Sequence, residues 1–211
     1  MTALLAIKFL REGGVGPFSY FQWPLPGPGG PAAWVEPLPG DRGIFACDID
    51  HLVYWLAPEL WIIELDGEVA VEGRKLSAPR GRLVRRVEAW TREKEAAFGR
   101  ACAMRAQARA VAAIRDLGEA DLADRLARCG DHGSIDALQA AANGRREVVL
   151  AMGYASDALK FAPIDPAASM LCAAHVGLTE ERCVEERAWQ SRQIAADLSL
   201  GELLRERPPG N

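Results

Sequence analysis

The amino-acid composition of the chain changes near Trp90, and this change constrains the fold more than any other feature. Five of the six tryptophans lie at or before this residue, together with the larger clusters of proline and glycine. Residues 91–200 are instead rich in alanine, arginine and glutamate, and their apolar side chains recur with the period of a helix. Two differently built halves in a chain of 211 residues favour an α+β protein.

The first half has the pattern of a small domain made mostly of strands. Largely apolar runs at residues 4–10, 42–47 and 60–65 end in turn or cap residues, as strands do. The Asp66-Gly67 pair predicts a tight turn that joins residues 60–65 to residues 68–71 in a hairpin. Further short strands are predicted at 18–23 and 34–36, a short helix at 49–56 and extended chain at 74–87.

The second half is predicted to be helical. Its first helix runs from Thr91 to about Leu117, where Gly118 ends it, and shorter helices follow. Two apolar stripes are expected to face the core, one at Trp90, Ala97, Met104 and Val111, the other at Val184, Ala188, Ser191, Ala195 and Leu198. We therefore expect a β-rich domain over residues 1–88, five or six helices over residues 89–204 and a flexible tail over residues 205–211.

Charge and cysteine content exclude several classes of function. The net charge of −4 and the pI near 5.5 argue against a general nucleic-acid binder or a protein held on an anionic membrane. The five cysteines are irregularly spaced and form no Cys-x-x-Cys pair, so neither a metal site nor a disulfide framework is expected. A cytoplasmic protein that works without a membrane is the interpretation that fits this pattern.

One segment stands out against the acidic background. Residues 74–87 carry six basic side chains and no acidic one. If this segment is extended, Arg80, Arg82 and Arg86 share a face and can grip a carboxylate or phosphate. The segment is thus a candidate binding site for an acidic protein or a small anionic ligand. The alternative is that these arginines pair with glutamates of the helical half.

The first 90 residues resemble an uncharacterised bacterial family, common in actinobacteria, that joins a compact N-terminal β domain to a variable, alanine-rich helical region. The resemblance is carried by Lys8-Phe9-Leu10, Gly16-Pro17-Phe18, Trp34-Val35, Arg42-Gly43-Ile44-Phe45-Ala46-Cys47, Leu52 to Leu56, Leu60-Trp61, Glu64-Leu65-Asp66-Gly67-Glu68 and Arg74-Lys75 to Leu83. Relatives often have histidine where this chain has Phe45. The resemblance implies the architecture and no activity.

A second resemblance is to ADP-ribosyltransferase folds, and it would imply NAD as a cofactor. In those folds a basic residue on the first strand, a glycine-containing strand and an aromatic residue on the following helix form the NAD site. Lys8, residues 43–47 and Tyr54 match these places. Cys47 stands where those folds have a hydroxyl residue, and Glu64 lies earlier than their catalytic glutamate.

Three functions remain open from the sequence. The first is a non-catalytic binding or interaction protein that uses the arginine segment. The second is an NAD-dependent transferase with its cofactor in the β domain. The third is a structural subunit of an oligomer such as a homodimer, in which the alanine-rich stripes pack between chains.

Overall fold

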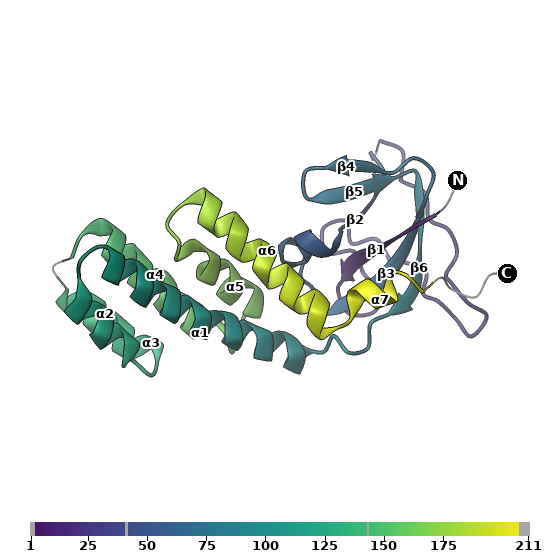
Figure 1. Ribbon diagram of the computed structural model, residues 1–211. Helices are drawn as coiled ribbons and strands as arrows, with labels where there is room; N and C mark the ends of the chain where they lie inside the picture. Colours follow the sequence, from purple (N-terminus) through teal and green to yellow (C-terminus); the bar gives the residue numbers. More distant parts are fainter. Residues whose placement is uncertain (1–2, 41, 143, 207–211) are drawn as a thin grey trace. The chain divides into compact units, whose positions relative to one another are not determined.

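The computed structural model describes residues 3–40, 42–142 and 144–206 (Figure 1). Their contacts divide the chain into two compact units. The sheet unit comprises the residues up to Arg92 together with those from Ser191 onward, and the helical unit comprises Glu93–Gln190. Most of the tail expected at residues 205–211 lies outside the described residues. The α+β class expected from the sequence is confirmed.

The first sheet of the sheet unit has three antiparallel strands. Strand β3 (Glu59–Asp66) lies in the middle, between β1 (Leu4–Leu10) and β6 (Arg80–Arg86). Leu60, Ile62, Ile63 and Leu65 are fully buried, so both faces of β3 are covered. A strand that is apolar on both faces needs a central position, and β3 has one.

The second sheet has the order β2-β5-β4 and corrects the predicted hairpin. Its strands are β2 (Ile44–Ala46), β4 (Ala70–Glu72) and β5 (Lys75–Ala78). The hairpin predicted between residues 60–65 and 68–71 is wrong, because β4 pairs with β5 while β3 pairs with β1 and β6. The eight-residue β3 finds seven-residue partners in β1 and β6, which cover it far better than the three exposed or half-buried residues of β4.

A backbone bridge connects β1 to the residue that follows β2. Ile7 in β1 and Cys47 after β2 exchange backbone hydrogen bonds of 2.9 and 2.8 Å. The other expected short strands are reduced to single bridges, Val15 with Gln22 and Val35 with Gly81. The short helix after β2 is the 3-10 helix η1 (Ile49–Tyr54).

Seven α-helices follow β6 among the described residues, so with η1 the structure has eight helices where five or six were expected. They are α1 (Arg92–Asp116), α2 (Ala120–Ala127), α3 (His132–Ala141), α4 (Arg146–Phe161), α5 (Pro166–His175), α6 (Glu180–Asp197) and α7 (Leu200–Leu203). The start of α5 is as predicted, because the Asp165 side chain accepts a hydrogen bond from the Ala168 N–H. No helix in the described part of the chain has the length and apolar character needed to cross a bilayer.

The predicted stripes of α1 and α6 are partly wrong. Met104 is 69% exposed, and the buried face of α1 consists mostly of small residues, namely Gly99, Cys102, Ala103, Ala106 and Ala110, together with Ile114. On α6, Val184 is exposed, whereas the carboxylate of Glu186 is buried between Arg105 and Arg109. The ion pairs with Arg105 and Arg109 therefore keep Glu186 buried on a face of α6 that the apolar pattern had predicted to be exposed.

Candidate functional site

Arg80, Arg82 and Arg86 of the arginine segment lie on β6, and the first two pair with carboxylates of the neighbouring strand β3. Arg82 Nε donates to Glu64 at 2.6 Å, and Arg80 Nε donates to Asp66 at 2.7 Å. Both guanidinium groups also lie over the Trp34 ring, 4.8 and 4.5 Å from its centroid for Arg80 and Arg82. The structure therefore brings these two arginines together, each already paired within the sheet unit.

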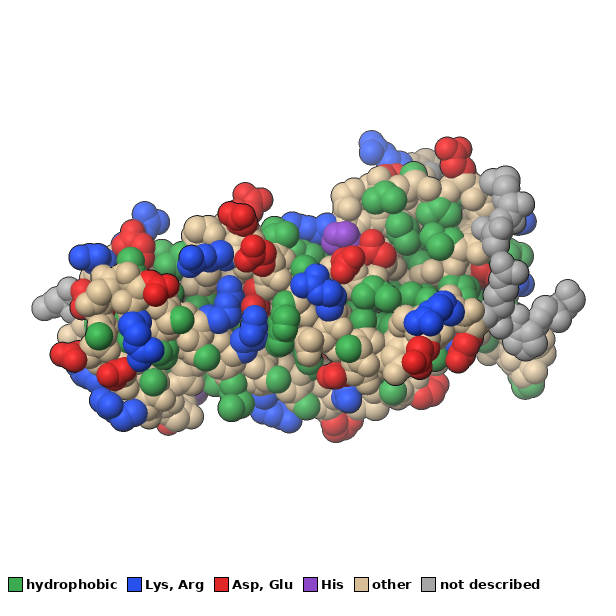
Figure 2. All heavy atoms as spheres, viewed as in Figure 1, with side chains coloured by type: hydrophobic (Ala, Val, Ile, Leu, Met, Phe, Trp, Pro, Cys, Tyr) green, Lys and Arg blue, Asp and Glu red, His purple; other side chains and the backbone are tan. Residues whose placement is uncertain are grey.

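Arg86 does not share their face. A register shift between Ile62 and Ile63 leaves Arg82 opposite Glu64 but Arg86 opposite Trp61. Because side chains alternate along a strand, one extra residue moves every later side chain to the other face. The expectation that Arg80, Arg82 and Arg86 form one surface is thus wrong. On the face shown in Figure 2, basic side chains are interspersed with acidic ones.

Arg86 instead approaches a buried carboxylate that the sequence did not reveal. Its guanidinium lies 3.3 Å from Glu59, which is 4% exposed. The Glu59 carboxylate also accepts hydrogen bonds of 3.0 Å from the backbone N–H groups of Gly13 and Gly14 and from Trp61 Nε1. This carboxylate fastens the turn after β1 to the start of β3.

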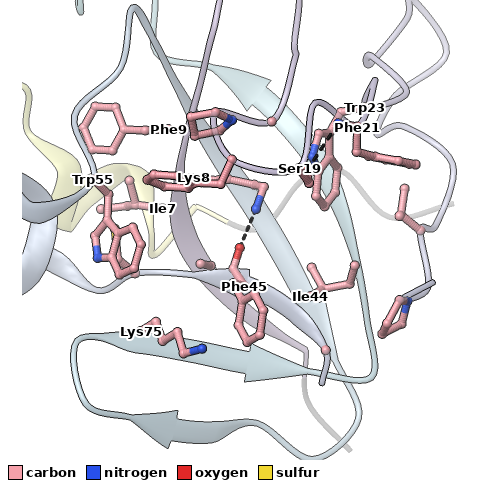
Figure 3. Close-up of a pocket in the computed structure, with 18 of the residues that line it drawn as sticks. Ile7, Lys8, Phe9, Ser19, Phe21, Trp23, Ile44, Phe45, Trp55 and Lys75 are labelled. Atoms are coloured by element: carbon pink, nitrogen blue, oxygen red, sulfur yellow. Dashed lines mark hydrogen bonds between the residues drawn. The ribbon is translucent and has the colours of Figure 1, made fainter. Parts of the chain in front are cut away.

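A pocket of about 420 Å³ opens in the sheet unit where the sheets meet (Figure 3). We call it the Lys8 pocket. Strands β1 and β2 supply one part of its lining, and the loops around Phe18 and Pro37 supply another. Its apolar and aromatic wall includes Ile7, Phe9, Phe18, Phe21, Trp23, Ile44, Phe45 and Trp55. Its volume and its mostly apolar wall with few polar groups are typical of sites for small molecules.

Lys8 is the polar group at the centre of this site. Its Nζ donates a hydrogen bond of 2.5 Å to the carbonyl oxygen of Phe45 and lies 4.6 Å from the ring centroid of Trp23 (Figure 3). Within the described part of the chain, no carboxylate oxygen lies within 4.0 Å of it. Burial disfavours the charged form and lowers the pKa of Lys8 to about 8.

The other ionisable groups of the pocket leave it with an excess of positive charge. Lys75 Nζ lies 3.8 Å from the ring centroid of Phe45 and 3.3 Å from Glu72, which partly neutralises it. Burial raises the pKa of the Cys47 thiol and keeps that group uncharged. The one carboxylate in the described lining belongs to Glu36, whose side chain is exposed. An ammonium group that has no counter-ion among the residues described therefore faces an aromatic cavity.

The structure brings together only part of the residue set that the NAD resemblance implies. Lys8 and residues 43–47 line the same pocket. Tyr54 is not among the lining residues, and its ring lies 4.0 Å from the guanidinium of Arg74. Glu64 accepts a hydrogen bond from Arg82 and does not line the pocket either.

Sequence patterns alone missed most of the pocket. Lys75, Trp23, Phe45 and Trp55 come from four separate segments, and no motif connects them. The available signal was Lys8 itself, a single charge in the apolar run of residues 4–10. Among the described residues, no cluster of three or more His, Cys, Asp or Glu side chains is placed to hold a metal ion.

Comparisons with protein-family models, with curated proteins and with solved structures found no match to this chain.

Proposed function

We propose that this protein binds a small anionic molecule with an apolar, ring-bearing body in the Lys8 pocket. The observation that carries this proposal is the position of the Lys8 ammonium, which faces an aromatic cavity and has no carboxylate within 4.0 Å among the described residues. A buried charge of this kind is costly unless a partner compensates it. A bound carboxylate or phosphate supplies that partner and leaves its apolar part against Phe21, Trp23 and Trp55.

The pocket is a better candidate than the arginine segment. Arg80, Arg82 and Arg86 each have a carboxylate within 3.3 Å, so a ligand anion has to displace an existing partner. Among the described residues, the Lys8 ammonium has the neutral carbonyl of Phe45 and the Trp23 ring as its partners. An incoming anion therefore gains more at Lys8, where it makes a charge-assisted hydrogen bond in a poorly solvated site.

A matched pair of ligands tests this proposal. 1-Naphthylacetate and 1-naphthylacetamide have nearly the same shape and differ in charge. We expect the anion to raise the melting temperature and to bind at least about tenfold more tightly than the amide, as a hydrogen bond to a charged group predicts. Lys8→Met should remove this preference, whereas Lys8→Arg should retain part of it. Equal binding of both ligands, or a preference that survives in Lys8→Met, would refute the proposal.

NAD is the second candidate ligand. It is favoured by the presence of Lys8 and residues 43–47 in one pocket, which is part of the arrangement that the ADP-ribosyltransferase resemblance implies. A titration with NAD in the same thermal assay separates the two candidates. Stabilisation by NAD that naphthylacetate competes away and that Lys8→Met abolishes would favour NAD. Stabilisation by naphthylacetate alone would favour the small aromatic anion.

A further inference from the structure

We propose that the amine of Lys8 condenses with the carbonyl carbon of an aldehyde or ketone held in the Lys8 pocket and forms an imine. This inference rests on the proposed function, because it requires that the pocket admits a small apolar molecule. It goes further by naming a carbonyl compound as the ligand class and a covalent bond as the mode of binding.

The position of Lys8 provides the geometry. The residue belongs to β1, which pairs along its whole length with β3, so its backbone is held firmly. The neighbouring residue Ile7 forms a backbone bridge with Cys47, and both residues line the cavity. The side chain thus projects from a fixed strand to the wall of a cavity of about 420 Å³, with its nitrogen against Phe45.

The contacts of the nitrogen leave it able to react. Its one hydrogen-bond partner in the described structure is the Phe45 carbonyl oxygen, which accepts an N–H of the side chain and leaves the lone pair of the neutral amine unoccupied. The Trp23 ring stabilises the cation less than a carboxylate would, and Cys47 is held in its uncharged form by burial. The free amine can therefore keep its hydrogen bond to Phe45 while its lone pair is available to a ligand.

The balance between ammonium and amine supports the same conclusion. With a pKa of about 8, roughly one-tenth of the Lys8 side chains are unprotonated at pH 7. This fraction is roughly 300 times that of a lysine at the ordinary value of 10.5. Desolvation of a lysine in an apolar pocket is an established way to activate its amine.

The reaction balances without an oxidant, a reductant or another reactant. The Nζ lone pair forms a bond to the carbonyl carbon, and the π electrons of the C=O bond move to oxygen, which takes up a proton as nitrogen loses one. The resulting carbinolamine then loses its oxygen as water, and nitrogen gives up its second proton and forms the C=N bond. One amine and one carbonyl compound yield one imine and one water.

Borohydride trapping of the full-length protein tests the proposal. The chain has four lysines, Lys8, Lys75, Lys94 and Lys160, so each can be followed in a peptide map. With 1-naphthaldehyde and cyanoborohydride at pH 7, we expect Lys8 to gain the mass of the aldehyde less one oxygen at least about ten times faster than any other lysine. Lys75 is the internal control, because it lines the same pocket but lies 3.3 Å from Glu72. The map also separates the α-amino group, whose ordinary pKa is similar.

The variants Lys8→Met and Lys8→Arg, with naphthylacetate as a competitor, make the result decisive. Lys8→Arg keeps a positive charge without a nucleophilic amine, so it should lose trapping at residue 8 while retaining part of its naphthylacetate binding. Melting curves of both Lys8 variants will show that they fold. The preference for Lys8 over Lys94 should be largest below about pH 8 and should shrink as pH rises toward 10.5, and excess naphthylacetate should slow trapping at Lys8 but not at Lys94.

The outcomes separate this inference from the proposed function. Lys8-dependent binding of naphthylacetate without selective trapping at Lys8 would overturn the imine and leave the binding function standing. Selective trapping without naphthylacetate binding would support the imine and refute the anionic ligand. Equal labelling of all four lysines together with an absence of binding would overturn both.

Discussion

The carboxylate of Glu59 accepts a hydrogen bond of 3.0 Å from Trp61 Nε1, two residues further along the same strand. Both side chains lie on one face of β3, and Glu59 is almost completely buried. The same carboxylate accepts the N–H groups of Gly13 and Gly14. It therefore links the first sheet to the turn that leads into the loop lining the Lys8 pocket.

Replacement of Glu59 should show how much this link stabilises the sheet unit. We expect Glu59→Ala to lower the free energy of unfolding by about 3–5 kcal/mol, because it leaves three N–H donors and a guanidinium without their acceptor. Glu59→Gln retains one acceptor oxygen and should cost less, about 1–3 kcal/mol. Denaturant unfolding measures both values. A Glu59→Ala protein as stable as the parent would show that water replaces the carboxylate.

Lys8 should make stability depend on pH in alkaline solution. Its pKa is about 8 in the folded protein and 10.5 in the unfolded chain, so between these values the unfolded chain binds more protons. Stability therefore rises with pH across this window, by up to about 3 kcal/mol, as the folded ammonium loses its proton and its desolvation penalty. The buried thiols of Cys47 and Cys102 act in the opposite direction above pH 9, because burial raises their pKa.

Lys8→Met isolates the lysine contribution from that of the thiols. The difference in unfolding free energy, parent minus variant, should increase from pH 8 to about pH 10.5 and stay level below pH 7. Urea titrations at a series of pH values provide this difference. A difference that does not change with pH would mean that Lys8 has its ordinary pKa in the folded protein, and the case for its reactivity would weaken with it.

The arginine segment should prove structural. We expect the combined replacement of Arg80, Arg82 and Arg86 by Gln to lower stability by about 1–3 kcal/mol, since it removes two partly exposed ion pairs and the cationic neighbour of Glu59. Affinity for naphthylacetate should stay unchanged, because none of these residues lines the pocket. Calorimetry of binding and unfolding distinguishes this outcome from the opposite one, in which stability is kept and binding of an acidic partner is lost.

Close packing of α1 on α5 should make Gly99 intolerant of a side chain. A Cβ at this position would lie 2.9 Å from Pro166 Cβ, and Ser169 Oγ donates to the Gly99 carbonyl at 3.2 Å. Alanine favours a helix over glycine by about 1 kcal/mol. We nevertheless expect Gly99→Ala to lower stability by about 1–3 kcal/mol, as overpacking does.

Gly130→Ala is the matched control for that replacement. Apart from its two chain neighbours, no described residue has an atom within 4 Å of the added Cβ, and Gly130 is exposed. Its free energy of unfolding, obtained from melting curves, should change by no more than about 0.5 kcal/mol. Equal shifts for both variants would show that α1 moves away from Pro166 at little cost.

The sequence predicted the parts of this fold that are encoded by local patterns. The apolar run of residues 4–10 became β1, and the Asp165-Pro166 start signal became the start of α5. The partner of β3 was not predictable in this way, because Asp66-Gly67 favours a local hairpin while burial of both faces of β3 requires distant strands. The bulge that turns Arg86 away from Arg80 likewise leaves no local signal, since it depends on the register with β3.

The candidate site was predicted less well than the fold. Lys8 was singled out only through its position in a resemblance, and the arginines were singled out by charge density. A high density of arginines could not reveal that the residues opposite Arg82 and Arg80 on β3 are Glu64 and Asp66. The aromatic wall assembles from segments far apart in the chain, so it exists only once the two sheets have met at Ile7 and Cys47.

The division of the sheet unit between the two ends of the chain affects how the protein is made. Its strands leave the ribosome early, but Ile194, Leu198 and Leu200, all buried, leave it about a hundred residues after β6. Ser191 Oγ then accepts the Val53 N–H at 3.3 Å. During synthesis the helical unit is complete before the sheet unit is, so the nascent β strands must wait with part of their apolar surface uncovered.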